Sequence, residues 1–88
     1  MKEVEIHGRK IGVTSNIDAV GLFCPMPIVR LKIELDKMNS NQVVEILADD
    51  PGFKNDVITW CDRTHHKLLS LTKTEEDVFV AYIEKAKE

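Results

Sequence analysis

Cys24 is the residue of this chain best placed for nucleophilic chemistry. It stands in the stretch Gly21–Arg30, GLFCPMPIVR, where Pro25 follows it at once and Pro27 comes two residues later. Proline has a fixed φ and no amide hydrogen, and it is tolerated in the first turn of a helix, where amide donors have no partner within the helix. We therefore predict a helix with Pro25 as its first residue, Pro27 as its third, and Cys24 at or next to the N-cap.

A cysteine at the start of a helix is expected to be reactive. The sulfur of Cys24 would face the positive end of the helix dipole and the free amide of Met26, and both favour the nucleophilic thiolate. Gly21 can adopt a positive φ and bend the chain before it, and Leu22 and Phe23 would surround the sulfur with apolar surface. The alternative is a small residue beside the core, but the two prolines and the position favour function.

Other kinds of thiol chemistry lack the residues that they need. A cysteine hydrolase requires a base, and His65 and His66 are expected at the far end of a second helix. A dithiol redox site normally has C-x-x-C, but Pro27 stands at the second cysteine's place. Cys24 and Cys61 are too few for a disulfide framework, and no four-ligand zinc pattern is present. The sequence predicts a lone thiolate that passes a group between proteins, without metal or cofactor.

The composition limits the partners. The chain has 88 residues and a formal charge of −3, with basic and acidic residues interleaved, which argues against nucleic acid as the partner. No apolar run approaches the ~18 residues that span a bilayer, and the first ten residues contain no apolar signal segment. We expect one small domain in the reducing cytoplasm with free thiols and no membrane contact.

The hydrophobic pattern predicts an α+β fold in the order β-α-β-α-β-β. The predicted elements are strands at residues 16–20, 42–48, 67–73 and 78–85, and helices at 25–38 and 51–65. Right-handed crossovers would place both helices on one face of a four-stranded mixed sheet, giving a two-layer α/β sandwich. Residues 2–13 could form an extra strand, a hairpin arm or a loose extension.

Details of the elements give further expectations. Asp50 is predicted to cap the second helix, with Pro51 as its first residue. The last strand is apolar on both faces, with Val78, Val80 and Tyr82 on one face and Phe79, Ala81 and Ile83 on the other. The face of the sheet away from the helices could therefore carry a partner or a dimer contact, or be covered by the N-terminal residues.

The stretch Ile17–Lys32, IDAVGLFCPMPIVRLK, resembles the Asp-x-x-Gly-x-x-Cys-Pro-x-Pro pattern of the TusA/SirA/YedF sulfur-carrier family. The matching residues are Asp18, Gly21, Cys24, Pro25 and Pro27. The similarity continues through Leu47–Leu71 and covers about residues 17–85. It implies the same element order and a sulfur-carrier domain at residues 16–88, with residues 1–15 as an N-terminal extension or extra strand.

The resemblance also implies a function. Cys24 would accept sulfane sulfur as a persulfide from a cysteine desulfurase or a rhodanese-like donor, and would deliver it to an acceptor protein of the TusD/DsrE kind. Known destinations in the family are tRNA thiolation, molybdenum-cofactor assembly and sulfur oxidation. Pro25, Met26 and Pro27 would shape the site, and Asp18 and Gly21 the turn before it. Such a protein is a relay component and not a self-contained enzyme, and its cargo is covalent.

The remaining polar residues have weaker expectations. Cys61 is predicted to be a buried structural cysteine, and His65 and His66 to be structural or surface residues. The family often has Gly-His where this chain has His65–His66, which leaves the end of the second helix open. The cations of the first helix, Arg30, Lys32 and Lys37, could form a basic rim for an acidic partner or a solvated face. The rival functions are an interaction or regulatory module without sulfur chemistry and, less favoured by the acidic balance, RNA binding.

Overall fold

The predicted order of elements is present, and one further strand precedes it. A computed structural model describes residues 2–23 and 25–86 of the chain. Its elements are β1 (Lys2–Ile6), β2 (Arg9–Asp18), α1 (Met26–Lys37), β3 (Val43–Ala48), α2 (Phe53–Thr64), β4 (Lys67–Lys73) and β5 (Phe79–Glu84). The predicted helices and later strands therefore agree with the structure to within two residues at each end. The predicted strand at 16–20 overlaps only the last three residues of the longer β2 and extends two residues beyond its end.

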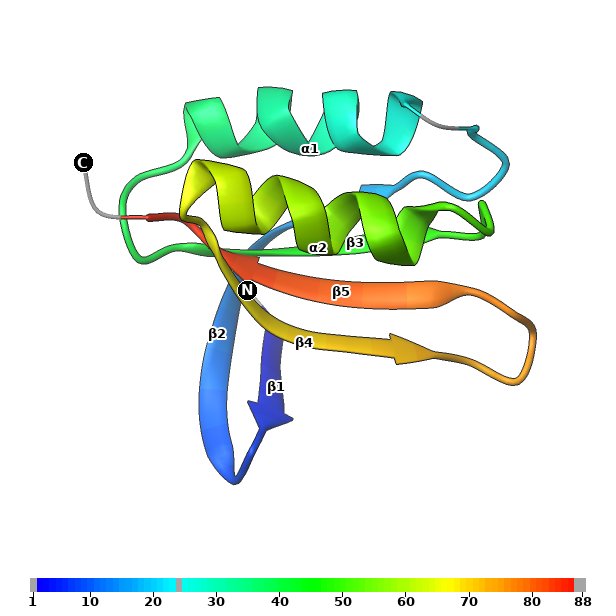
Figure 1. The fold of residues 1–88 in the computed structure, drawn as a ribbon. Coiled ribbons are helices and arrows are strands. Elements are labelled where there is room, and N and C mark those ends of the chain that lie inside the picture. Colours follow the sequence, from blue (N-terminus) through cyan, green and yellow to red (C-terminus); the bar gives the residue numbers. More distant parts are fainter. Residues whose placement is uncertain (1, 24, 87–88) are drawn as a thin grey trace.

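The described residues form one mixed sheet with two helices on one face (Figure 1). The strand order is β1-β2-β3-β5-β4, in which β2 and β3 are parallel and the other neighbours are antiparallel. The α+β two-layer prediction is confirmed, but the sheet has five strands and not four. The fifth strand is β1, which returns on β2 through His7 and Gly8, both at positive φ as in the tight turns that suit hairpins.

The core between the helices and the sheet consists of aliphatic side chains, two phenylalanines, Met38 and Cys61. Phe53 of α2, Leu31 and Leu35 of α1, and Val44 and Ile46 of β3 are almost completely buried there. Each element thus contributes one apolar face, as the helical and strand periodicities require. The core fixes α1 and α2 against the sheet, and the loops at the ends of the strands are positioned by it.

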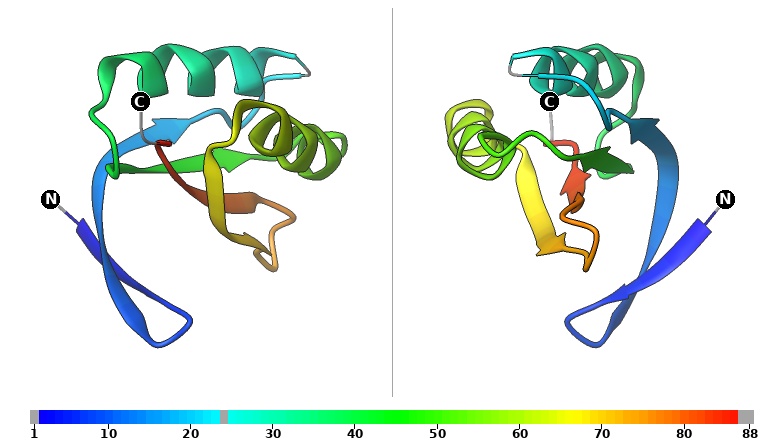
Figure 2. Two further views of the ribbon diagram at one scale, coloured as in Figure 1. Left: turned by 60° about the vertical axis from the view of Figure 1, so that its left-hand side comes forward. Right: turned by 90° about the vertical axis from the view of Figure 1, so that its right-hand side faces the viewer.

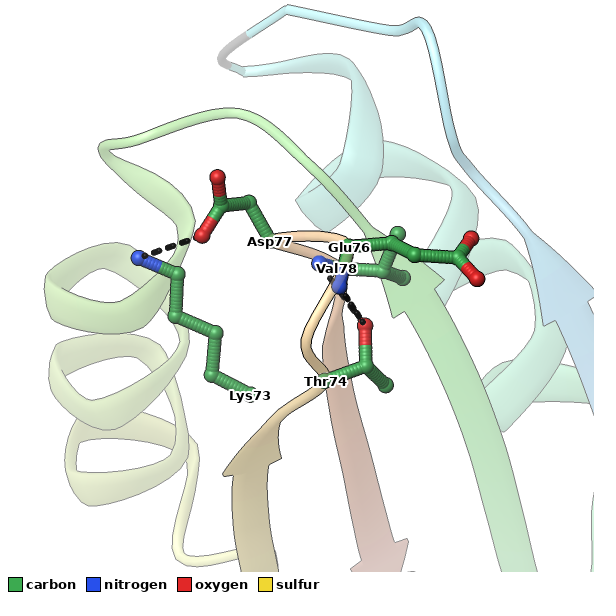
Figure 3. Close-up of polar contacts among 5 residues, drawn as sticks. All are labelled: Lys73, Thr74, Glu76, Asp77 and Val78. Atoms are coloured by element: carbon green, nitrogen blue, oxygen red, sulfur yellow. Dashed lines mark hydrogen bonds and ion pairs between the residues drawn. The ribbon is translucent and has the colours of Figure 1, made fainter.

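The polar segment 74–77, TEED, between the last two predicted strands predicts a tight connection and an antiparallel hairpin. In the structure β4 and β5 pair antiparallel and are joined through this segment (Figure 3). The Thr74 amide donates to the Val78 carbonyl at 2.8 Å, and the Thr74 hydroxyl accepts the amides of Glu76 and Val78 at 3.3 and 3.2 Å. Asp77 takes a positive φ of 63° and pairs with Lys73 at 3.4 Å. The predicted hairpin is confirmed.

An irregularity in β2 turns the N-terminal hairpin to the other face of the sheet. The pairing register of β2 with β3 shifts between Val13 and Ser15. Beyond the shift, the Ser15 hydroxyl donates to Glu34 Oε2 of α1 at 2.6 Å, so Ser15 faces the helices. Before the shift, Val13 is level with Val43 of β3. Val43 is the neighbour of the helix-facing Val44, so the side chains of Val43 and Val13 point away from the helices.

The face away from the helices is partly covered by this hairpin. Figure 2 shows β1 and the first part of β2 bending away from the helices. Ile6, Val13 and Val43 are nevertheless buried, and so is Glu45, although no helix covers them. This burial agrees with the alternative in which the N-terminal residues cover part of the face, next to β2 and β3.

Tyr82 and Glu45 face each other on this side of the sheet. From their hydrogen bond we predict that the free energy of unfolding decreases at alkaline pH. The Tyr82 hydroxyl donates to Glu45 Oε2 at 2.5 Å, and burial, this hydrogen bond and the negative charge of Glu45 raise the pKa of Tyr82 from 10.0 to about 12. Since the fold favours the protonated phenol, its stabilising contribution is complete below pH 10 and is lost as the pH rises through 12.

The measurement is urea unfolding of the wild type and of Tyr82→Phe across that pH range. The wild type is expected to lose more stability than the variant between pH 10 and 12. Burial also raises the pKa of Cys61, from 9.0 to about 11, and this adds the same alkaline loss to both proteins. Parallel pH profiles for the two proteins would contradict the assignment to Tyr82.

Candidate functional site

Helix α1 begins one residue later than the sequence predicts. Pro25 is the N-cap and Met26 the first helical residue, so Pro25 and Pro27 stand at the N-cap and at the second position and not at the first and third. The Met26 amide, predicted to be free, donates to the Phe23 carbonyl at 2.9 Å, because the chain already turns at Phe23. Cys24 lies between them in sequence, outside the described residues, so its predicted position stays a prediction.

The loop before Cys24 is held by two aspartates. Asp18 Oδ1 accepts the amide of Val20 at 3.1 Å, which forms a tight turn directly after β2. The Gly21 amide donates to Asp49 Oδ1 at 2.9 Å, and Gly21 has a φ of +88°, a conformation that glycine adopts without strain. The predicted turn residues Asp18 and Gly21 therefore lie in this turn, and Leu22 packs against the core behind it.

Asp49 is a site residue that sequence reasoning misses, because its position directly after the predicted strand at 42–48 indicates only a turn. It follows the end of β3, and β3 lies parallel to β2, so the carboxyl ends of both strands reach the same edge of the sheet. Ala19 extends this pairing by donating its amide to Leu47 at 2.8 Å. The signal that could have paired Asp49 with the loop is an aspartate at the end of each of two adjacent parallel strands, Asp18 as the last residue of β2 and Asp49 directly after β3.

The start of α2 also differs from the prediction. The helix begins at Phe53 with Gly52 as N-cap, and no side chain caps it. Asp50 instead contributes its carbonyl, which accepts the Phe53 amide at 3.0 Å, while its Oδ2 is buried with no hydrogen-bond partner among the described residues. The prediction of Asp50 as N-cap is therefore wrong, because the turn at Pro51 and Gly52 delays the helix by two residues.

The second thiol and the two histidines are structural. Cys61 is buried among core residues, and burial raises its pKa to about 11, so its thiol is protonated at neutral pH. His65 has a φ of 64° and ends α2 in the left-handed conformation usually given to glycine. His66 Nδ1 accepts the amide of Ala86 at 3.0 Å, its ring lies 5.3 Å from Trp60, and burial lowers its pKa.

These histidines are remote from the Cys24 loop. Figure 1 shows α1 and α2 starting at the same end of the helical layer, so His65, at the end of α2, lies at the opposite end. No hydrolase-like base therefore approaches the loop from there.

Within residues 2–23 and 25–86, no cluster of three His, Cys, Asp or Glu side chains could hold a metal ion. Neither helix described is long and apolar enough to cross a membrane.

The residues on both sides of Cys24 are open to solvent. Phe23 is 74% exposed, and Pro25 and Met26 are exposed as well, whereas Pro27 is buried under the helix. Of the two apolar residues expected around the sulfur, Leu22 turns to the core and only Phe23 faces outward. Beside Pro25 a groove of about 310 Å³ runs between the helices, with Trp60 and Arg63 among its lining residues. The neighbours of Cys24 thus leave room for a second macromolecule.

Comparisons with known proteins agree on one family. Residues 15–85 match the profile described as sulfurtransferase TusA. The chain is 44% identical over 69 residues to YrkI of Bacillus subtilis, a candidate sulfur carrier protein, covering 78% of this chain and 91% of YrkI. It is 39% identical over 70 residues to the sulfur carrier protein TusA of Allochromatium vinosum, covering 80% and 91%.

A solved structure has the same fold. The crystal structure of a SirA-like protein from Desulfitobacterium hafniense superposes with a TM-score of 0.75, covering 84% of this chain and 100% of that one. The two sequences are 21% identical, so this similarity concerns the fold.

Proposed function

Because this chain belongs to the sulfurtransferase TusA family, we propose that it is a sulfur carrier whose Cys24 holds sulfane sulfur as a persulfide. The observation that carries the proposal is the family match over residues 15–85, within which Cys24 directly precedes in sequence Pro25, the N-cap of α1. Over the aligned residues this chain is 39% identical to TusA of Allochromatium vinosum, which is named a sulfur carrier protein, and 44% identical to YrkI of Bacillus subtilis, which is named a candidate one.

The proposed transfer is thiol–persulfide exchange. The Cys24 thiolate attacks the outer sulfur of a donor persulfide, a new S–S bond forms at Cys24, and the S–S bond of the donor breaks. The donor cysteine leaves as a thiolate with the electron pair of the broken bond, so one neutral sulfur atom moves and no external oxidant or reductant is needed. Delivery repeats the same step, with a thiolate of the acceptor protein as the nucleophile.

The surroundings of Cys24 support this chemistry. A persulfide is more acidic than a thiol and is anionic at neutral pH, and the N-terminus of a helix stabilises an adjacent anion. The residues next to Cys24 in the sequence are exposed to solvent, so the thiolate of a partner protein can approach this loop. These residues are Phe23, Pro25 and Met26. The buried, protonated Cys61 offers no competing nucleophile, so the proposal assigns the cargo to Cys24 alone.

The partners follow from the same chemistry. A cysteine desulfurase or a rhodanese-like protein presents a persulfide on its own cysteine and is the proposed donor in the cytoplasm. The proposed acceptor is a further protein thiol, in tRNA thiolation, molybdenum-cofactor assembly or sulfur oxidation. In each case the chain acts as one step of a relay, since Cys24 must be emptied before it can be charged again.

Intact-mass measurement tests the proposal. The purified, reduced protein is incubated with inorganic polysulfide, or with a cysteine desulfurase and cysteine. It is expected to gain the mass of one sulfur atom and to lose it after dithiothreitol treatment. Peptide mapping should place the added sulfur on the peptide that contains Cys24. If the protein stays at its original mass while another sulfur carrier is charged in parallel, the proposal fails and the interaction-module hypothesis gains.

A further inference from the structure

The chain that leaves β5 is held to the start of β4 by a side chain that can change its charge. His66 lies between the end of α2 and β4, and its Nδ1 accepts the backbone amide of Ala86 at 3.0 Å. Figure 1 shows the ends of α1, α2 and β5 on the same side of the molecule, opposite the start of α1. The contact is therefore remote from the Cys24 loop, and the proposed sulfur transfer does not use it.

Only the neutral imidazole of His66 can make this hydrogen bond. A neutral histidine has one N–H and one acceptor nitrogen, whereas an imidazolium has an N–H on both ring nitrogens. Since Nδ1 accepts the amide of Ala86, the neutral ring carries its proton on Nε2. A second proton on Nδ1 would point at the N–H of Ala86, so protonation of His66 and its contact with Ala86 exclude each other.

The surroundings of His66 favour the neutral ring. The residue is half-buried, and its ring centroid lies 5.3 Å from that of Trp60 on α2. Burial is the largest cause that lowers the pKa of His66 below 6.5, the positive charge of Lys85 lowers it further, and Asp36 of α1 acts in the opposite direction. The other titratable groups near this contact line the hollows beside it, and they are Asp62, His65, Lys67 and Glu84.

Lys85, the residue before Ala86, is held independently of His66. Its backbone amide donates to the carbonyl of Gln42 at 2.9 Å. Its side chain is buried, and Nζ donates to the carbonyl of Met38 at the end of α1 at 2.6 Å. Loss of the His66 contact therefore leaves β5 in place and frees the chain only from Ala86 onward.

We propose that His66 is a pH-sensitive latch for the C-terminal end of the chain: the neutral ring holds Ala86 at the start of β4, and protonation releases it. A hollow of about 570 Å³ beside His66 and one of about 250 Å³ beside Ala86 leave room for water at both groups. The charged ring and the released amide can therefore be hydrated. The inference goes beyond the proposed function and does not depend on it.

The direction of the pH dependence follows from the neutral ring in the folded state. Because the fold lowers the pKa of His66, the contact with Ala86 is complete above pH 6.5 and is lost as the pH falls through that lowered pKa. The release should precede the unfolding of the domain, since the contacts of Lys85 do not involve the ring.

NMR spectroscopy of the isotope-labelled full-length protein tests the proposal between about pH 7.5 and about pH 5. The ring signals of His66 report its protonation, and the backbone amide of Ala86 reports the contact. The Ala86 amide signal is expected to move with the same midpoint as the His66 ring. Its order parameter should fall from about 0.8 to below about 0.6.

Variants at the three histidines separate the latch from other effects of acid. His66→Asn keeps an acceptor oxygen that does not titrate, so Ala86 should stay ordered over the whole pH range. His66→Phe keeps a ring beside Trp60 but has no acceptor, so Ala86 should be mobile at every pH. The controls are His65→Asn and His7→Asn, because both residues have a positive φ that asparagine tolerates, and both variants should show the wild-type transition.

Three results would overturn the latch. The first is an Ala86 amide that stays ordered while the His66 ring is protonated, and the second is a transition that persists in His66→Asn. The third is a His66 ring that stays neutral until the signals of β5 disappear, because acid would then unfold the whole domain without an earlier release. None of these results affects sulfur loading on Cys24 at neutral pH, so the latch and the proposed function can fail separately.

Discussion

Replacing Cys24 by serine is expected to abolish sulfur loading completely. The serine hydroxyl has nearly the shape of the thiol, but it is not ionised at neutral pH and does not attack a persulfide sulfur. The loss should therefore appear with every sulfur source, polysulfide and protein donor alike. Intact-mass measurement after incubation with either donor checks it, and the variant should remain at its original mass.

Cys61→Ser is the matched control for this result. Cys61 is 4% exposed and its pKa is raised to about 11, so its thiol neither reaches a donor nor ionises at neutral pH. The variant should load one sulfur like the wild type, although the buried hydroxyl costs some stability. Loading in Cys24→Ser, or its loss in folded Cys61→Ser, would move the persulfide to Cys61 and contradict the proposal.

The sequence was sufficient for the family and for most of the fold, because both depend on local patterns. The spacing of Asp18, Gly21, Cys24, Pro25 and Pro27 predicted the TusA family, and the match over residues 15–85 confirms it. The helices and the β4–β5 hairpin followed from apolar periodicity and polar turns. Each of these signals is contained within one element or two consecutive elements, so it does not depend on how distant segments pack.

The features that the sequence did not predict arise between segments. One extra residue in β2, between Val13 and Ser15, exchanges the faces of the strand, so a single alternation cannot be followed through it. The support of Gly21 by Asp49 spans 28 residues and becomes visible only when β2 and β3 are known to be parallel.

The helix starts were placed one to two residues too early for a similar reason. The preference of proline for the first helical position predicts helix starts at residues 25 and 51. In the structure Pro25 is the N-cap, and Pro51 lies in the turn before Gly52. The same φ suits all of these positions, so proline marks the approach to a helix more securely than its first residue.

The largest expected effect on stability comes from Phe53→Ala. Phe53 is the first residue of α2, is fully buried, and lies with its ring centroid 6.1 Å from that of Phe79 on β5. Truncating a buried phenylalanine removes apolar burial and leaves a cavity, which costs about 3–5 kcal/mol. A domain of this size is stable by only about 5–10 kcal/mol, so the variant should lose about a third of its stability or more.

Denaturant unfolding followed by the fluorescence of Trp60 measures this loss, and Ile58→Ala on the same helix is its control. Ile58 is 43% exposed, so its truncation should change the free energy of unfolding by less than about 1 kcal/mol. Should Phe53→Ala fail to fold, Phe53→Leu keeps most of the volume and should lose about 1 kcal/mol. Equal losses in the free energy of unfolding for Phe53→Ala and Ile58→Ala would mean that Phe53 does not hold α2 on the sheet. Other contacts would then have to hold the turn at Asp49, which supports the Cys24 loop.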